Sequence, residues 1–146
     1  MVMQRVELSR NLEHLNNNKM KTILTEQLLL FILLIHFLAD FSLQTDDQAK
    51  GKSTDIKWLF YHVGVYSLIW LMASWFYFGD FRPALVFALV TFVAHYTTDY
   101  TTSRVGKPFW DKGDYHNGFT VVGFDQILHY LQLYYTFKLI SLYFIT

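Results

Sequence analysis

The sequence predicts an all-α protein, an integral membrane bundle of four transmembrane helices, and three observations favour this fold class. The chain of 146 residues is 53% hydrophobic and 19% aromatic, with only 16% charged residues, which is more apolar than a typical soluble domain. Its apolar residues gather in stretches of about 20 residues, the length that crosses a hydrocarbon core. Each stretch lacks a polar face along its full length, which argues against helices on the surface of a soluble domain.

The composition also excludes several classes of function. The formal net charge is zero, so nothing indicates a nucleic-acid partner. Cysteine is absent, which excludes disulfides, thiolate metal ligands and a cysteine nucleophile. Any metal ion must therefore be bound by nitrogen and oxygen atoms, which suit zinc, manganese, iron or magnesium.

The N-terminal segment, residues 1–22, is polar and lacks the apolar core of a signal peptide. Two interpretations stay open for it. It is a polar tail, or a short helix on which Leu8, Leu12 and Leu15 form a thin apolar stripe. The membrane domain is expected to occupy residues 23–146.

The four expected spans run in order through this domain, at residues 23–43, 58–78, 83–102 and 121–143. Tryptophan and tyrosine towards the span ends are typical of membrane interfaces. Residues 79–82 form a tight link between the second and third spans, and Pro83 suits the first turn of the third. The longer loops, 44–57 and 103–120, lie on one side of the membrane, whereas lysines and arginines on both sides leave the orientation open.

Histidine and aspartate recur four residues apart inside these apolar stretches, a spacing that puts both side chains on one helix face. Three such pairs are present, with a single histidine in the second span: His36 and Asp40, His95 and Asp99, Asp125 and His129, and His62. The order of each pair follows the direction of its span. At about 1.5 Å per residue, the aspartates form a shallow ring and the histidines a deeper one.

This matching of depths predicts a metal site. Ionisable groups are costly inside a bilayer and indicate function. The predicted ligands are His36, Asp40, His62, His95, Asp99, Asp125 and His129. They can hold one divalent ion with open positions, or two ions bridged by a carboxylate, with zinc favoured. The three aspartates are also the catalytic candidates, as general base or as partners that orient a histidine. Alternatively, the same groups only hydrogen-bond neighbouring helices.

Three further residues are weaker candidates for substrate binding or for a lid. Gln44 lies one turn above Asp40 and can reach the mouth of the site, or it caps the helix end. His116 and Asn117 lie in the second long loop, where they contact substrate or are simply solvated. Gln126 neighbours Asp125, but successive helical residues point about 100° apart.

The set of motifs HFLADFSLQT, a separate span with one histidine, HYTTD and GFDQILH resembles an uncharacterised family of small integral membrane proteins of bacteria and phages. The resemblance covers His36 to His129 and implies a location in the bacterial inner membrane. In ligand style the pattern is similar to membrane-embedded metal-dependent hydrolases, such as the alkaline-ceramidase-like and DNA-damage-induced inner-membrane groups. That second similarity concerns ligand type alone.

Three functions therefore compete. The first is a membrane-embedded metal-dependent hydrolase acting on a lipid or phosphoester near one membrane surface. The second is a non-enzymatic phage or bacterial membrane interaction protein whose polar rings, with or without a structural metal, join the helices. The third is transport of a metal ion or proton. Membrane lipid is the expected partner, and the oligomeric state stays open.

Overall fold

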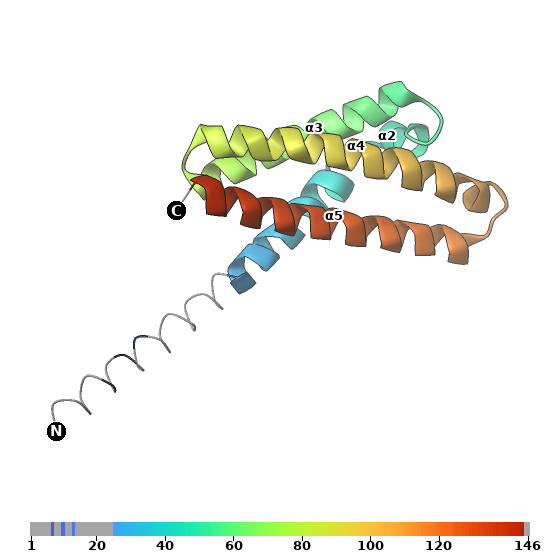
Figure 1. Ribbon diagram of the computed structural model, residues 1–146. Coiled ribbons are helices and arrows are strands. Elements are labelled where there is room, and N and C mark those ends of the chain that lie inside the picture. The colour runs from blue at the N-terminus through green and yellow to red at the C-terminus, as the bar shows by residue number, and fades with distance from the viewer. Residues whose placement is uncertain (1–6, 8–9, 11–12, 14–24, 145–146) are drawn as a thin grey trace. The chain divides into compact units, whose positions relative to one another are not determined.

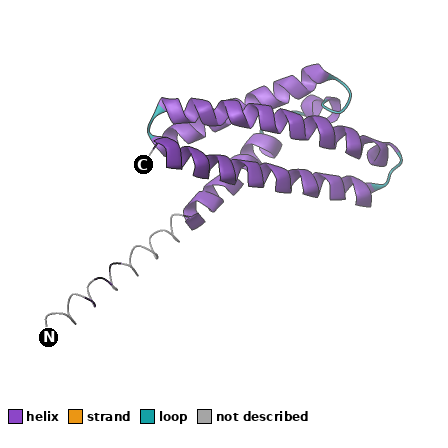
Figure 2. Ribbon diagram, in the orientation of Figure 1, coloured by secondary structure: helices purple, strands orange, loops and turns teal. Residues whose placement is uncertain are grey.

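The computed structural model describes residues 7, 10, 13 and 25–144. The chain divides into two compact units, Met1–Ile32 and Leu33–Thr146. Every regular element in the described residues is a helix (Figure 2), so the predicted all-α class is confirmed. Most of the polar segment 1–22, including the proposed leucine stripe, lies outside the described residues.

The first apolar stretch changes its helical geometry where the site begins. Residues 25–37 are α-helical, and a π-helix, η1, follows at Leu38–Ser42. The Leu43 N–H closes this wider turn on Leu38 O at 3.0 Å. Short π-helical segments are rare and often accompany functional sites. Here the segment carries the buried Asp40.

A short helix and a long helix come next. Helix α2 spans Asp46–Gly51, and Thr45 begins it with a capping box, in which its hydroxyl accepts from Gln48 N–H and the Gln48 side chain accepts from Thr45 N–H. Helix α3 spans Ile56–Phe78, with Asp55 as its N-cap. Residues 44–57, expected to be a loop, therefore contain one helix and the start of another.

Helices α4 and α5 complete an antiparallel set with α3. Helix α4 spans Phe81–Asp111 and packs against both α3 and α5, which spans Tyr115–Phe144 (Figure 1). The link between α3 and α4 is tight, because Gly79 ends α3 with φ +69° and Asp80 caps α4. A positive φ of this kind favours glycine.

The expected loop at residues 103–120 is wrong, because α4 continues to Asp111 and α5 begins at Tyr115. Two i,i+4 contacts stabilise the extension. Lys107 Nζ lies 2.6 Å from Asp111 Oδ2, and the Arg104 guanidinium stacks 3.7 Å from the Tyr100 ring centroid. Such pairs support a helix, and Pro108 is tolerated near the end of α4.

Helices α3, α4 and α5 bury polar side chains and expose many large apolar ones. The interior contains most of the histidines and aspartates of the expected rings. Large apolar side chains face outward along the helices, among them Leu68, Met72, Leu89, Val93, Ile127, Leu131 and Leu139, each more than 45% exposed. Scattered exposed apolar residues are ordinary, whereas continuous apolar faces indicate another phase or partner.

Two helical segments are long and apolar enough to cross a membrane by length and composition, Thr25–Ser42 and Ile56–Phe78. These coincide with the first two expected spans. Helices α4 and α5 have 31 and 30 residues, and the polar side chains that they carry lower their hydropathy. Composition therefore identifies two membrane candidates among the described residues.

Candidate metal centre

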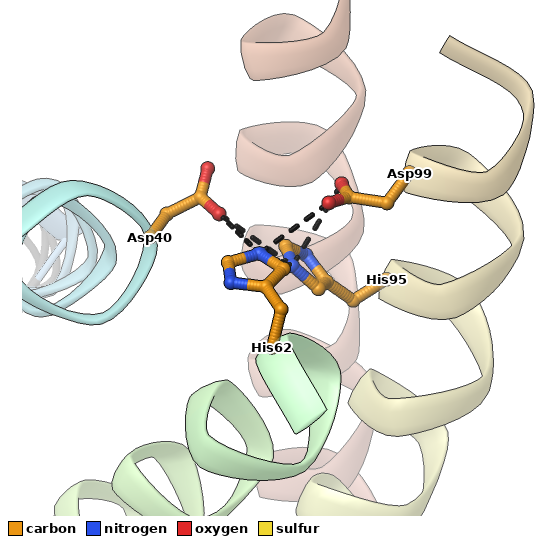
Figure 3. Close-up of side chains that lie close together, drawn as sticks. All are labelled: Asp40, His62, His95 and Asp99. Atoms are coloured by element: carbon orange, nitrogen blue, oxygen red, sulfur yellow. Dashed lines mark hydrogen bonds and ion pairs between the residues drawn. The ribbon is translucent and has the colours of Figure 1, made fainter. Parts of the chain in front are cut away.

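Four buried side chains from three helical elements converge at the centre of the unit Leu33–Thr146. Asp40 comes from η1, His62 from α3, and His95 with Asp99 from α4 (Figure 3). Each residue is at most 3% exposed. Each offers one ligand atom, and these atoms lie within 4.8 Å of one another. This set is called the four-ligand group below.

The distances between ligand atoms of the four-ligand group suit a cation with tetrahedral coordination. His62 Nε2 lies 3.0 Å from Asp40 Oδ1, 3.1 Å from His95 Nε2 and 3.3 Å from Asp99 Oδ2. His95 Nε2 lies 3.5 Å from Asp40 Oδ1 and 3.7 Å from Asp99 Oδ1. Tetrahedral ligands about 2.0 to 2.1 Å from zinc lie roughly 3.3 to 3.4 Å from one another.

Hydrogen bonding alone does not satisfy these contacts. A neutral imidazole carries one N–H, so His62 Nε2 can donate to only one of its three neighbours. Facing lone pairs of nitrogen and oxygen repel unless a proton or a cation lies between them. The donor set is two imidazoles and two carboxylates, which zinc and similar divalent ions accept. The residues therefore fit a metal ion.

A second group of three adjoins the first and shares Asp40. It consists of Asp40, Asp125 and His129, with ligand atoms again within 4.8 Å. His129 Nε2 lies 3.0 Å from Asp99 Oδ1 and 3.3 Å from Asp125 Oδ2, while its Nδ1 lies 3.2 Å from His95 Nδ1. The shared Asp40 carboxylate has the position expected of a ligand that bridges two ions.

His36 lies beside these groups, and both of its ring nitrogens have other partners. Its Nε2 donates to Gln126 Oε1 at 2.7 Å, because an amide oxygen can only accept. Its Nδ1 therefore accepts from the Tyr66 hydroxyl at 2.8 Å. The His36 Nε2 to Asp40 Oδ2 distance is 3.6 Å. His36 is buried as expected, and its role as a metal ligand stays a prediction.

Three contributors were not among the predicted site residues. The Gln126 amide donates to Asp40 Oδ2 at 3.1 Å and to Asp125 Oδ2 at 3.0 Å, so it orients both carboxylates. Tyr66 stacks on His95 with ring centroids 3.7 Å apart. Thr102 Oγ1 donates to Asp125 Oδ1. Such surrounding partners fix the orientation of metal ligands.

Lys52 was also missed, although among the described lysines and arginines it is the one that forms an ion pair with an aspartate of the site. Its Nζ lies 2.7 Å from Asp99 Oδ2. Burial opposes the charge, but the carboxylates of Asp99 and Asp40 outweigh that effect and raise the pKa of the Lys52 ammonium. Three carboxylates and one ammonium leave two net negative charges, which a divalent cation neutralises.

A cavity of about 510 Å³ opens onto one side of this centre. Asp40, Asp125 and Gln126 line it on the site's side, whereas Asp99 does not line it. Of the three catalytic candidates, two therefore face a space that a substrate can enter. The Asp99 carboxylate instead lies against Lys52 Nζ, His62 Nε2 and His129 Nε2.

The weaker candidates separate into two locations. Gln44 lines the cavity, as its predicted place at the mouth requires. His116 and Asn117 lie exposed in the first turn of α5 and are not among the cavity residues. Asn117 instead bonds to Asp114, whose side chain accepts from both its backbone and its amide N–H. The structure does not bring His116 or Asn117 to the centre.

The comparisons with known proteins bear on the chain as a whole. No curated protein and no solved structure matches it. The sequence matches the family described as "Protein of unknown function (DUF3307)" over residues 28–145, a region that contains every residue of the metal centre and the cavity. The chain is a member of this uncharacterised family.

Proposed function

We propose that the chain is a membrane-embedded metal-dependent hydrolase that acts on a lipid or phosphoester near one membrane surface. The observation that carries this proposal is the convergence of buried nitrogen and oxygen ligands beside a cavity. Structural metal sites are usually closed by protein ligands, whereas catalytic sites keep a position open to substrate. Here Asp40 belongs to both ligand groups and also lines the cavity.

The proposed ion is divalent, with zinc the best match to the donor set, and one or two ions can be held. Asp40, His62, His95 and Asp99 would hold the first, and Asp125 with His129 would complete the second around Asp40. A divalent ion supplies a Lewis acid that polarises a carbonyl or phosphoryl oxygen and makes water more acidic. The surrounding protein supplies orientation and charge.

The aspartates have separable roles in this proposal. Asp125 is the best-placed proton acceptor, because it lines the cavity and its carboxylate is oriented by Thr102 and Gln126. Asp99 is a ligand and a positioning residue, because it lies 3.0 Å from His129 Nε2 and 3.3 Å from His62 Nε2. A carboxylate that orients an imidazole in this way also fixes its tautomer.

A membrane setting for four spans is part of the proposal. The outward apolar faces of α4 and α5 support it, since Leu89, Val93 and Leu131 lie on the outside while aspartates and histidines lie inside. Lipid-facing surfaces are apolar, and polar residues face the interior of a helical bundle. The bacterial inner membrane, which the sequence resemblance implies, is the proposed location.

The packing on the far side of the histidines favours hydrolysis over transport. Trp70, Phe87 and Phe137 are all 0% exposed, and they come from α3, α4 and α5. Their ring centroids lie 4.2 to 5.9 Å apart, so the three rings fill the space between the helices. Transport needs access from both sides, and this aromatic layer opposes it.

Turnover by metal-loaded protein tests the proposal. The purified chain, reconstituted in lipid vesicles with zinc, is assayed against a p-nitrophenyl phosphodiester and a long-chain p-nitrophenyl ester. Asp125→Asn should retain the ion of the four-ligand group, of which Asp125 is not a member, and should lower the rate by about 100-fold, as loss of a general base does. The control, Asp47→Asn, changes an exposed carboxylate that does not line the cavity and should leave the rate unchanged. A metal-loaded protein that hydrolyses neither probe would favour the interaction protein with a structural metal.

A further inference from the structure

The cavity beside the metal centre carries an inference about its ligand. It lies between the end of α2, the C-terminal part of α4 and the first half of α5. We infer that this cavity binds an anionic amphiphile, a molecule with a phosphate group and an apolar chain. The inference rests on the proposed function, which it deepens by naming the substrate class.

Cationic side chains line the exposed part of the cavity. Lys50, Lys52 and Lys107 are all lining residues, and their side chains are 81%, 19% and 38% exposed. The carboxylates of Asp40 and Asp125 are at most 10% exposed. Lys50 and Lys107 therefore lie at the exposed part of the cavity, where Asp111 pairs with Lys107, whereas Lys52 and the two carboxylates lie deeper. An anionic group that enters meets the lysines first.

Lys50 and Lys107 form exposed ion pairs with aspartates, and a phosphate group can displace these aspartates. Lys50 lies 3.6 Å from Asp46, and both side chains are more than 80% exposed. Lys107 pairs with the half-exposed Asp111. Exposed ion pairs contribute little to stability, so a phosphate can replace either carboxylate at low cost. Lys52 differs, because Asp99 holds it at 2.7 Å.

Two hydrogen-bond donors in the cavity wall also point to an acceptor-rich ligand. Gln44 Nε2 and Ser103 Oγ are shielded from solvent and have no hydrogen-bond partner among the described residues. Both residues line the cavity. An unpaired polar group in a shielded position costs free energy unless a ligand or water satisfies it. Phosphate oxygens accept several hydrogen bonds at once.

The remaining wall is apolar and includes a fixed aromatic ring. Trp110 lines the cavity together with Phe41, Val121 and Val122. The ring packs against Gly118 of α5, where a Cβ atom would lie 2.8 Å from Trp110 Cε2. Only glycine therefore allows the ring to lie here. An acyl or alkyl chain gains apolar contact along this wall, which inorganic phosphate cannot use.

Tryptophan fluorescence provides the test, with the full chain held in an uncharged sugar detergent. Three probes are titrated: dodecyl phosphate, the uncharged octaethylene glycol dodecyl ether, and inorganic phosphate. Dodecyl phosphate should bind saturably, at least about 10-fold more tightly than either other probe, since each lacks one of the two interactions. Equal binding of the two dodecyl compounds overturns the anion site. Equal binding of both phosphates overturns the apolar chain.

Matched variants locate the binding. Lys50→Ala/Lys107→Ala should raise the Kd for dodecyl phosphate about 10-fold, and Ser103→Ala should raise it by roughly half an order of magnitude. The control, Lys57→Ala/Lys112→Ala, removes two exposed lysines outside the cavity and should leave the Kd unchanged. Equal losses in the two double variants would assign the effect to net charge and overturn the site.

Two measurements separate this inference from the proposed function: the dodecyl phosphate titration repeated in EDTA, which removes metal, and zinc uptake measured without EDTA. If the protein binds dodecyl phosphate in EDTA and takes up no zinc, the result supports the cavity inference and contradicts the hydrolase. Zinc uptake without selective binding of dodecyl phosphate contradicts the cavity inference and leaves the metal centre standing.

Discussion

His62 and Asp40 approach each other across two helical elements more closely than His36 and Asp40 do along one. The His62 Nε2 to Asp40 Oδ1 distance is 3.0 Å, whereas His36 Nε2 lies 3.6 Å from Asp40 Oδ2. Asp99 repeats this arrangement, because His129 on α5 lies 3.0 Å from it and His95 on its own helix 3.7 Å. Asp40 and Asp99 therefore connect separate helices, and substitutions of them should affect both metal binding and the packing of the helices.

Asp40→Asn should weaken metal binding more than Asp125→Asn does. Asp40 belongs to both possible ligand groups and Asp125 to one, and an amide has one oxygen and no charge to offer. We expect a loss in zinc affinity of about 100-fold or more for Asp40→Asn. Competition with a fluorescent zinc chelator measures it. Equal affinities of the two variants would contradict the shared position of Asp40.

Gln126→Leu should lower metal affinity although glutamine is not a ligand. The amide holds Asp40 and Asp125 and accepts from His36. Loss of such an orienting partner typically costs about 10- to 100-fold in affinity. The matched control is Gln132→Leu on the same helix, α5, where the amide donates to Thr91 and Thr136 and not to the site carboxylates. Similar zinc affinities for Gln126→Leu and the unmodified chain would show that the carboxylates orient themselves.

Tyr66→Phe should separate the hydroxyl contact from the ring contact. The substitution removes the donor to His36 Nδ1 and keeps the stack on His95. We expect a loss of about 1 kcal/mol in the free energy of unfolding. Tyr66→Ala should cost about 3 to 5 kcal/mol, because it also leaves a cavity at a position with no exposure. Urea unfolding in detergent measures both values, and equal losses would assign the whole effect to the ring.

The start of α5 should lose stability in acid through Asp114. Hydrogen bonds from Asn117 lower the pKa of the Asp114 carboxyl below its ordinary value of 3.8. Because the pKa is lower in the folded state, the contribution to stability is present above pH 3.8 and disappears as the pH falls through the folded pKa. The Tm should therefore fall more between pH 5 and pH 3 for the unmodified chain than for Asp114→Asn. Parallel pH profiles would contradict this role.

The sequence predicted the helical class and the histidine–aspartate pairs that the structure buries, because these depend on local periodicity. His95 and Asp99 share a face of any α-helix, and their burial follows from the apolar residues around them. The mutual contacts of His62, His95 and His129 follow from helix packing, which periodicity leaves undetermined.

Other features depend on tertiary structure and were missed. Gln126 was expected to point away from Asp125, yet its flexible side chain reaches back to that carboxylate at 3.0 Å. Lys52 lies in a turn distant in sequence from Asp99, so only folding brings them together. Residues 103–120 were expected to form a loop, but the contacts of Lys107 and Arg104 with residues one turn away continue α4.

Metal content tests the central claim most directly. The detergent-purified chain is measured by elemental mass spectrometry beside His62→Ala/His95→Ala and beside His116→Ala, which removes an exposed histidine outside the centre. The unmodified chain and His116→Ala should each carry about one or two equivalents of a divalent transition metal, and the double variant should carry none. Equal metal content in all three proteins, or no metal after reconstitution with zinc, would contradict the metal centre.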